Sequence, residues 1–534
     1  MSAGIERLLD GDTTYDYVVV GAGSGGCVVA GRLSEDPGVR VCLVEAGPPD
    51  NDARMRVPSG AALLQQTEYD WDYDTAEEPF CGSRRIYLPR GKVLGGTSVL
   101  NGMVYTRGNP ADYDGWGIPG WTYRDLLPYF KRAEDNSRGE DDHHGVGGPL
   151  GVTDGWYRSP ATSAFVEAAT AAGFPANRDF CGPVQEGFGF YQITGRNGER
   201  CSAATAYLHP ALARPNLTVE TGVLVERVSF EDGRAAGVVA RRGGERVTIR
   251  ATREVVLAAG AYNSPQLLML SGVGPADHLR ATGIPVVADL PMVGQNLQDH
   301  PQCWLVFTHE LPVSLAIGAE PRHTRQYARD RTGPLASNGP EAGGFVRTGR
   351  GPHPDVQFHA VAAGLAGNRP ADVGGHAFSL APCVLAPRSR GSVGLVGADP
   401  ATKPQIRHNY LADEADLDTM VAGLRIGLEI ARQSALAPFT QTRWQGPASD
   451  SDADLRAYAR RNTHTLFHPA GTCAMGEVVD GDLRVRGVEG LRVVDASVMP
   501  AIVRGNPNAP IIAIAERAVD LIRGNVPALA AAGA

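Results

Sequence analysis

The feature that most constrains this chain is a glycine turn between an apolar strand and a helix of small residues near the N-terminus. The strand covers 18–20, the helix covers 28–33, and a second apolar strand follows at 41–44. Three glycines in the turn have the spacing G-x-G-x-x-G: Gly21, Gly23 and Gly26. The first allows a tight turn, the second lets the backbone approach a pyrophosphate, and the third lets the helix pack on the strand. The unit therefore predicts a dinucleotide site in an α/β domain.

Two neighbouring features favour the same ligand. The N-terminus of the helix supplies free N–H groups and the positive end of a helix dipole, which suit phosphates. Glu45 follows the second strand, about 20 residues beyond the turn, where an acid accepts hydrogen bonds from the ribose of an adenosine. A purely structural glycine turn is the competing interpretation, and the complete strand–helix–strand context disfavours it.

Composition restricts the class of protein. A chain of 534 residues is too long for one simple core and suggests two or three domains. A net charge of −9 without a basic stripe argues against nucleic-acid binding. We expect neither a signal peptide nor a membrane span, because no apolar run approaches roughly 20 residues. The 8 cysteines show no C-x-x-C pair or metal-site spacing, which predicts buried reduced thiols, no metal site and a cytoplasmic location.

The rest of the chain indicates a mixed α/β fold with two domains. Ser159 is expected to cap a helix, and residues 216–241 alternate like strands around a turn at Asp232 and Gly233. The middle of the chain is rich in proline and glycine, with short strand-like runs. We predict a Rossmann-like nucleotide domain built from separated segments, and a substrate domain with a mainly antiparallel sheet. The nucleotide domain is assigned 12–155, 196–305 and 455–525, and the substrate domain 156–195 and 306–454.

Several further motifs follow in order along the chain. Arg90 and Lys92 bracket a turn into a glycine cluster, which offers cations and backbone N–H groups to phosphates and to the polar edge of a flavin ring. The later motifs are GAYNSPQLLMLSGVGP, VGQNLQDHP, HPAGTCAMG, LRVVDASVMP and NPNAPIIAIAERAVDLI. Together they closely resemble the glucose–methanol–choline (GMC) family of FAD-dependent oxidoreductases, which includes choline dehydrogenases and alcohol oxidases. The resemblance runs from Tyr15 to Ile522 and is loosest in the middle domain.

The resemblance implies FAD as the cofactor. It places the glycine turn and Glu45 on the ADP half, Val225 beside the adenine, and Asn101, Gly102 and Met103 near the reactive face of the flavin. The other cofactor contacts expected are Ser24, Ala46, Arg90, Val93, Gly95, Gly96, Ser98, Val104, Ala259, Gly260, Asp495, Ala496, Pro507 and Asn508. Choline oxidases carry a flavin-linking His at the position of Leu100. Since leucine has no nucleophile, we expect the FAD to be non-covalent.

His468 is the expected catalytic base. Oxidation of an alcohol removes the hydroxyl proton while hydride leaves the carbon for flavin N5, and an imidazole accepts a proton near neutrality. His468 lies at the position of the family's catalytic His in H-x-x-G-T-x-x-M-G, whereas the other histidines considered are interpreted as structural: His143, His144, His408 and His464. Asn506 is the expected second catalytic residue, donating to the substrate oxygen. Its alternative role is to cap the turn before Pro507.

The helix after Asn506 is expected to begin with Asn508 as its N-cap and to end at Gly524. If its N-terminus faces the flavin, as the resemblance implies, its dipole favours the anionic reduced cofactor by on the order of 1 kcal/mol.

Three residues are candidates for contact with substrate. His359 resembles an active-site His of choline oxidases, and Glu341 lies in a stretch resembling one in choline dehydrogenases. Glu341 either holds a cationic head group or is a solvated acid. Leu466 is expected to control a small oxygen cavity; choline oxidases have the smaller Val there, which favours a dehydrogenase.

The function predicted is FAD-dependent oxidation of a primary alcohol to the aldehyde, with hydride transfer to flavin N5. The alternative is a flavin-dependent lyase or photodecarboxylase of the same fold, and a third hypothesis is a non-catalytic FAD-binding protein. The partners expected are a small alcohol and either O2 or another electron acceptor. The sequence leaves open the alcohol, oxidase against dehydrogenase, and monomer against homodimer.

Overall fold

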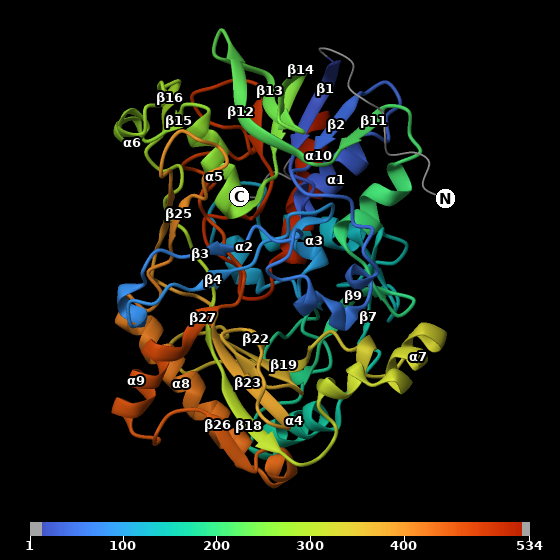
Figure 1. Cartoon of the computed structure of the whole chain (residues 1–534), viewed down its shortest axis with the longest axis vertical. Helices are drawn as coiled ribbons and strands as arrows, with labels where there is room; N and C mark the ends of the chain where they lie inside the picture. Colours follow the sequence, from blue (N-terminus) through green and yellow to red (C-terminus); the bar gives the residue numbers. More distant parts are fainter. Residues whose placement is uncertain (1–12, 526–534) are drawn as a thin grey trace, which may run out of the picture.

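The structure is a computed structural model that describes residues 13–525 and contains two large sheets, one in each half of the molecule (Figure 1). The upper half in Figure 1 holds a seven-stranded sheet and the lower half an eight-stranded sheet. This mixed α/β architecture, with a mainly antiparallel sheet in the lower half, confirms the fold class predicted from the sequence.

The seven-stranded sheet has the order β11-β2-β1-β14-β13-β12, with β28 paired to β14. Strands β11, β2, β1, β14 and β28 are parallel, whereas β12 and β13 form an antiparallel hairpin through the expected turn at Asp232. Their bounds are β1 Thr13–Val20, β2 Val41–Val44, β11 Leu217–Glu220, β12 Val223–Glu231, β13 Arg234–Arg242, β14 Glu245–Leu257 and β28 Leu491–Val493. Strand β2 is buried along its whole length, which explains its uninterrupted apolar sequence.

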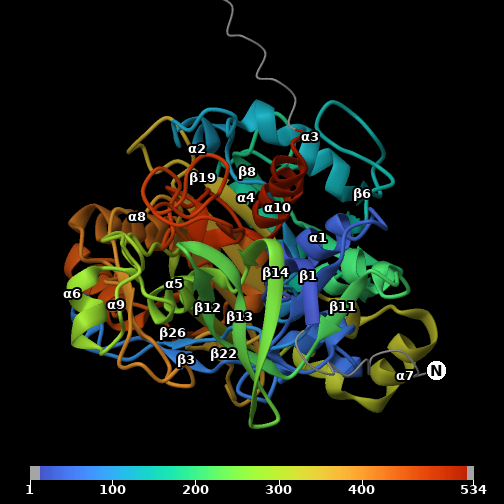
Figure 2. The ribbon, with the colours of Figure 1, turned by 90° about the horizontal axis from the view of Figure 1, so that it is seen from above.

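Helices α1 (Ser24–Leu33) and α10 (Asn508–Arg523) lie side by side against this sheet, as the view from above shows (Figure 2). The buried carboxylate of Glu516 on α10 joins them, because it pairs with Arg32 of α1 at 2.9 Å and with Arg132 of α3 (Tyr123–Ala133) at 2.8 Å. Helix α5 (Gly260–Leu270) follows β14. The first and last segments of the chain are thus packed into one nucleotide-binding unit.

The eight-stranded sheet has the order β26-β18-β23-β20-β19-β8; β17 joins it by pairing with β23, and β27 joins it by pairing with β17. All its pairs are antiparallel. Their bounds are β8 Gly187–Phe190, β17 Pro301–Cys303, β18 Leu305–His309, β19 Pro340–Val346, β20 Val356–Val361, β23 His376–Val384, β26 Thr442–Gln445 and β27 Thr463–Thr465.

Alternation along these strands gives the sheet two different faces. Leu305, Phe358 and Leu380 point to the face covered by α4 (Pro160–Ala171), α8 (Glu414–Ala431) and α9 (Asp452–Asn462). Their strand neighbours, such as Val306 and Ala381, belong to a separate apolar cluster on the other face. That second face is directed at the site described below.

The smaller elements complete the connection between the halves. A five-stranded sheet contains β5 Val104–Tyr105, β6 Glu134–Asn136, β7 Leu150–Asp154, β9 Gln192–Arg196 and β10 Glu199–Arg200. Short helical segments important for the site are η2 Pro58–Leu63, η4 Gly96–Val99, η7 Leu315–Ala319, α7 Pro321–Asp330 and η8 Pro334–Ala336.

Local predictions meet different outcomes. Ser159 caps α4 as expected, with its hydroxyl accepting from the Ala161 N–H at 3.2 Å. Asn508 as an N-cap is wrong: α10 begins at Asn508, Pro507 precedes it as the cap, and the Asn508 side chain instead accepts from the Ser24 hydroxyl. The domain boundaries stay a proposal, and strands β17 and β27 pair in the eight-stranded sheet although both lie in ranges assigned to the nucleotide domain.

All the cysteines are free and buried, as expected. Within residues 13–525, no helix has the length and apolar character that a membrane crossing requires.

Candidate active site

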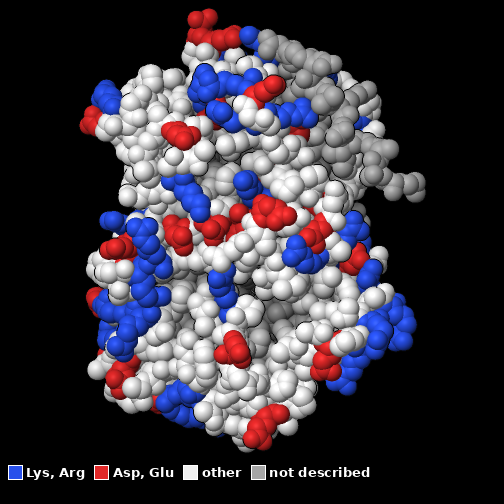
Figure 3. Space-filling model, in the orientation of Figure 1, with Lys and Arg blue, Asp and Glu red and all other residues white. Residues whose placement is uncertain are grey.

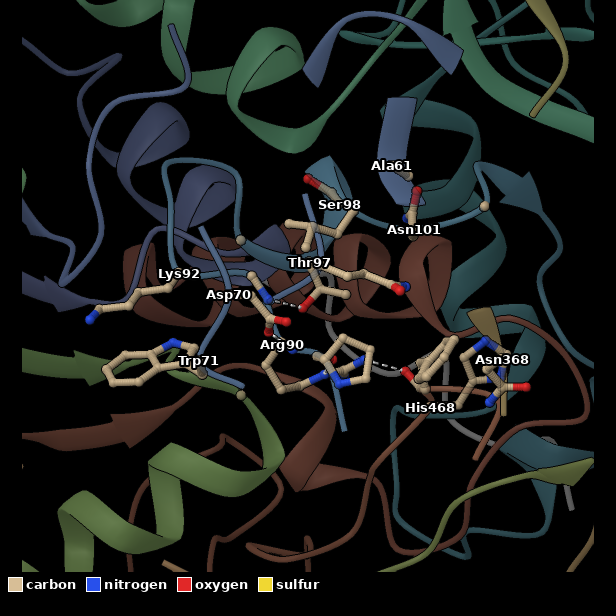
Figure 4. A pocket seen from close by; sticks show the side chains of 18 of the residues that line it. Ala61, Asp70, Trp71, Arg90, Lys92, Thr97, Ser98, Asn101, Asn368 and His468 are labelled. Atoms are coloured by element: carbon tan, nitrogen blue, oxygen red, sulfur yellow. Dashed lines mark hydrogen bonds between the residues drawn. The ribbon is translucent and has the colours of Figure 1, made fainter. Parts of the chain in front are cut away.

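A cavity of about 1090 Å³ is lined by residues of both halves of the molecule. The seven-stranded half contributes the glycine turn, Glu45 and the start of α10, and the eight-stranded half contributes residues between Gln302 and Ala377. The close view in Figure 4 shows Lys92 beside Trp71 on one side, His468 on the other, and Arg90 between them.

The three glycines of the turn have separate roles. A Cβ on Gly26 would lie 1.8 Å from the backbone oxygen of Gly21, so the helix packs here only without a side chain. Gly21 has φ +95°, the left-handed region that favours glycine. Gly23 has no neighbour closer than 3.8 Å to such a Cβ and lines the cavity. Its missing side chain therefore leaves room for a ligand against the backbone.

Two helix N-termini meet at this part of the cavity. The Ser24 hydroxyl at the start of α1 donates to the Asn508 side-chain oxygen at the start of α10 at 2.7 Å. Neither N-terminus has a side-chain cap. Because the first N–H groups of a helix have no partner within it, both helices present donors toward a ligand in the cavity.

The carboxylate of Glu45 is fixed by backbone donors. Its oxygens accept from the N–H groups of Ala22 and Gly47, both at 2.8 Å. Burial raises the pKa of Glu45 to about 7. Since each carboxylate oxygen has two lone pairs, both can still accept a ligand hydroxyl.

The turn that carries His468 follows β27 and is held on several sides. Phe467 adopts φ +69°, a strained conformation for a bulky residue. The Arg90 guanidinium donates to the Phe467 carbonyl at 2.7 Å, and Asp299 accepts from the His468 N–H at 2.8 Å. Asp299 also accepts from the hydroxyls of Thr465 and Tyr410. These contacts keep the imidazole in one position.

A second histidine determines the tautomer of His468. The His300 Nε2 lies 3.1 Å from the Leu385 carbonyl, which can only accept, so His300 carries its proton on Nε2. The His300 Nδ1 therefore accepts from the His468 Nδ1, 2.9 Å away. The Nε2 of His468 is then left with its lone pair, and it faces Asn506.

The orientation of Asn506 is fixed from the opposite end. Tyr191 donates to the Phe358 carbonyl at 2.6 Å and so accepts from the Gln357 amide at 3.1 Å. The same Gln357 nitrogen donates to the Asn506 side-chain oxygen at 3.0 Å. The Asn506 nitrogen consequently points at the His468 Nε2, 3.2 Å away. The carbonyl of Leu385 at one end and that of Phe358 at the other thus give the same direction to every hydrogen bond between them.

Burial keeps these imidazoles neutral. It holds the pKa of His468 well below its usual 6.5, with His300, His359 and Arg90 as further causes. Burial likewise lowers the pKa of His300 to about 4 and that of His359 to about 3. Near neutral pH all three imidazoles are therefore neutral, with one N–H each, and His468 has a free lone pair to accept a second proton.

Most residues singled out in the sequence lie around this cavity. The lining includes His468, Asn506, His359, Leu466, Gly21, Gly23, Ser24, Glu45, Ala46, Arg90, Gly96, Ser98, Leu100, Asn101, Gly102, Met103, Val104, Val225, Ala259, Gly260, Asp495, Ala496, Pro507 and Asn508. Gly26, Val93 and Gly95 do not line it. Gly26 sits in the helix–strand contact, Val93 is buried in a small apolar cluster, and the Gly95 N–H bonds to the Ala22 carbonyl at 2.8 Å.

Glu341 also lies outside the lining of the cavity, and it is not a solvated acid either. Its carboxylate is buried and accepts from the Ser159 N–H at 2.7 Å and from the hydroxyls of Thr162 and Ser337. The acid thus stabilises the first turn of α4 and has no oxygen directed at the cavity.

Two residues of the site were not identified from the sequence. His300 lies in the VGQNLQDHP motif, so its neighbourhood was noticed but its side chain was not assigned. Gln357 lies two residues before His359 in β20, and period-two alternation places both on one face. The sequence feature that could have identified Gln357 is a polar residue within an otherwise mainly apolar strand.

Two regions of the chain, 15–302 and 387–515, match the GMC oxidoreductase family. The chain is 45% identical to an oxygen-dependent choline dehydrogenase of Paraburkholderia phymatum, over 96% of this chain and 93% of the relative. It is 43% identical to an alcohol dehydrogenase [acceptor] of Pseudomonas putida, over 95% of both. Among solved structures, it is similar to a variant of formate oxidase from Aspergillus oryzae, studied for modification of its FAD. That likeness has a TM-score of 0.91 and 27% identity, over 96% of this chain and 99% of the other.

Proposed function

The chain belongs to the GMC oxidoreductase family and is an FAD-dependent enzyme acting on CH–OH donors, and we propose that it oxidises a primary alcohol to the aldehyde with His468 as the base. The names of its relatives suggest choline or another alcohol as substrate. The single observation that carries the proposal is the hydrogen-bond network that leaves a lone pair on the His468 Nε2 beside Asn506.

The residues of the cavity fit FAD. The space against Gly23, the uncapped N-termini of α1 and α10, and the carboxylate of Glu45 suit a pyrophosphate and a ribose. When bound, FAD supplies the acceptor for a hydride. Leu100 lines the cavity without a nucleophile, which supports non-covalent binding; denaturing the holoenzyme should release all its FAD into the supernatant, and protein-bound flavin would contradict this.

His468 and Asn506 divide the work on the alcohol. A substrate hydroxyl that replaces the bond between them donates its proton to the His468 Nε2 and accepts from the Asn506 amide. The O–H proton passes to His468 and the C–H hydrogen leaves as hydride with two electrons, so the alcohol becomes an aldehyde. Because the pKa of His468 is low in the free site, the base is unprotonated at the start of each turnover.

Leu466 stays the candidate for control of oxygen access. This residue lies two positions before His468. Its side chain lines the cavity and packs on the cluster that contains Val104 and Tyr191. Its position supports a role in whether O2 or another acceptor reoxidises the flavin.

The test is anaerobic bleaching of the flavin by a panel of alcohols. We expect His468→Ala to retain FAD and to reduce it about 10²–10⁴-fold more slowly than the native enzyme. His464→Ala is the matched control, because this half-buried histidine lies four residues away and does not line the cavity. Near-normal reduction in His468→Ala would remove it from the base role. Failure of every alcohol to bleach the bound flavin of the native enzyme would favour the lyase or photodecarboxylase alternative.

A further inference from the structure

The face of the eight-stranded sheet that is turned away from its helices forms an apolar wall of the cavity. Trp304, Val361 and Ala377 belong to one buried cluster on this face and line the cavity. Half-buried side chains from neighbouring segments pack on the cluster and also line the cavity: Leu315, Ala363, Leu365 and Val373. We call these seven residues the apolar wall.

No charged side chain stands in this part of the lining. The residues that line the cavity from 58–65 and from 302–377, all within the described part of the chain, include no Asp, Glu, Lys or Arg. Trp304 is the one indole or phenyl ring among them. A quaternary ammonium group is usually bound by an acid or by several aromatic faces, and these two segments offer neither arrangement.

The acids elsewhere around the cavity are already committed. Asp70 accepts from the N–H groups of Gln66 and Arg90, both at 2.9 Å, from that of Asp72 at 3.0 Å, and from the Tyr87 hydroxyl. These four bonds use the roughly four acceptor sites of a carboxylate. Asp495 accepts from the N–H groups of Gly260 and Ser497 and from the Ser264 hydroxyl.

The remaining charged residues of the lining are one acid, Glu45, and three cations, Arg90, Lys92 and Lys403. Glu45 stands at the glycine turn, and the ammonium of Lys92 lies 4.9 Å from the centre of the Trp71 ring. Glu341, the acid that the sequence offered for a cationic head group, is turned into the start of α4. A cation next to the apolar wall would thus lose its water without gaining a partner, which is costly.

The apolar lining continues to the surface. Leu63, at the end of η2, is 62% exposed and still lines the cavity, and Leu335 of the neighbouring η8 lines it too. Figure 3 shows a hollow near the middle of this face, with uncharged surface immediately to the right of it. An exposed leucine at the edge of a cavity suits the entry of an apolar molecule.

From these observations we propose that the substrate is an uncharged alcohol with an apolar, mainly aliphatic body that lies against the apolar wall, and that cationic amino alcohols are discriminated against. This inference rests on the proposed alcohol oxidation and assigns its substrate class. The hydroxyl is held at His468 and Asn506, and the remainder of the molecule extends along Val361 and Leu365 toward Leu63. The reaction is the one given above: hydride passes to FAD, and the hydroxyl proton passes to His468.

Chain length provides the first test. With the FAD-loaded enzyme under anaerobic conditions, the second-order rate constant for flavin reduction, written below as kcat/KM, is measured for linear primary alcohols from ethanol to decanol. Burial of each methylene is worth about 0.8 kcal/mol, which corresponds to about a fourfold rise in kcat/KM per carbon until the wall is covered. A value independent of chain length would overturn the proposal.

Charge is tested with a matched pair of substrates. Choline and 3,3-dimethylbutan-1-ol have the same shape, but only choline carries a positive charge. We expect kcat/KM for the neutral alcohol to be at least about 100-fold higher, because the cation must be desolvated without a partner. If choline is the better of the two, the substrate class is wrong while alcohol oxidation stands. If neither these two nor any linear alcohol bleaches the flavin, the proposed function itself fails.

A matched pair of variants locates the effect. Leu365→Glu places an acid in the wall, and Leu365→Gln places a neutral side chain of nearly equal size there. We expect the ratio of kcat/KM for choline to that for 3,3-dimethylbutan-1-ol to be at least about tenfold higher in Leu365→Glu than in Leu365→Gln. Equal ratios in two variants with normal FAD content would remove Leu365 from the substrate path. Val373→Glu and Val373→Gln repeat the comparison if the Leu365 pair does not fold.

Discussion

The two halves of this molecule face one cavity with opposite chemistry. The seven-stranded half presents backbone groups, bare glycines and two helix N-termini, and its Glu45 is fixed by backbone donors. The eight-stranded half presents side chains, most of them apolar, and among them the buried His359 has no hydrogen-bond partner on either ring nitrogen in the described structure. One half fits a large, charged cofactor, and the other fits the small, uncharged substrate that we propose.

This difference shows how each half tolerates change. Backbone recognition depends on the absence of side chains at given positions, so one added methyl group is disruptive. A wall of leucine, valine and alanine depends on total shape and polarity, so substitutions there alter preference more than they abolish binding. The predictions below test this contrast, beginning with the largest effect.

Gly26→Ala and Gly23→Ala should separate packing from ligand binding within the glycine turn. The Gly26 Cβ would meet the Gly21 oxygen at 1.8 Å, so we expect loss of stability of about 1–3 kcal/mol and more than about 100-fold loss of FAD occupancy. The Gly23 Cβ meets nothing within 3.8 Å, so the apoprotein should keep its thermal stability while FAD affinity falls. Thermal unfolding of apoprotein and FAD titration measure both. Equal stability of the two apo variants would contradict this account of the turn.

His300→Phe should slow flavin reduction by on the order of 10–100-fold with FAD retained, because the His468 Nδ1–H loses its acceptor. His300 is a positioning residue, so the conservative variant His300→Gln, which keeps an acceptor oxygen, should recover part of the rate. Stopped-flow reduction across pH distinguishes this from a packing defect. A positioning role predicts that the pH profile of the Phe variant shifts; an unchanged profile with equal rates in Phe and Gln would exclude it.

Acid should destabilise the eight-stranded half through neutral histidines that are buried or half-buried. Burial lowers the folded-state pKa of His300 and His464 to about 4 and that of His359 to about 3. Below the unfolded pKa of about 6.5 the unfolded chain binds more protons, so stability is complete above that pH and falls as the pH drops toward these folded values. Each group contributes about 1.4 kcal/mol per pH unit in that window. Unfolding free energies from pH 7 to 5 should show this slope, and His464→Gln should reduce it by one proton.

Leu466→Ala should have the smallest effect, a change of a few fold in the rate at which oxygen reoxidises the reduced flavin. The smaller side chain enlarges the space beside His468 without touching the hydrogen-bond network. The reductive rate with alcohol should stay within about twofold, since the removed side chain makes no bond to His468 or Asn506. If the oxygen rate does not change, Leu466 does not control access.

Site residues in contiguous sequence motifs could be predicted, whereas roles that depend on distant segments could not. The glycine turn, Glu45, His468 and Asn506 belong to contiguous motifs, and the structure gathers all of them around one cavity. The role of Glu341 could not be read from its own stretch of sequence, because its carboxylate accepts a hydrogen bond at the start of a helix that lies far away along the chain. Asn508 misled for a related reason, since its partner Ser24 is separated from it by almost the whole chain.

The sequence by itself determined the α/β class, the family and the positions at which FAD and the base are expected, because backbone turns and motif spacing are local properties. Only the tertiary structure decided which tautomer His468 adopts. The Leu385 carbonyl acts on it through His300, and the Phe358 carbonyl acts on the other end of the network through Tyr191 and Gln357. The apolar wall was decided in the same way. Its residues come from separate segments: the pairing of antiparallel strands puts Val361 and Ala377 on one face, and tertiary packing brings the other residues of the wall against them.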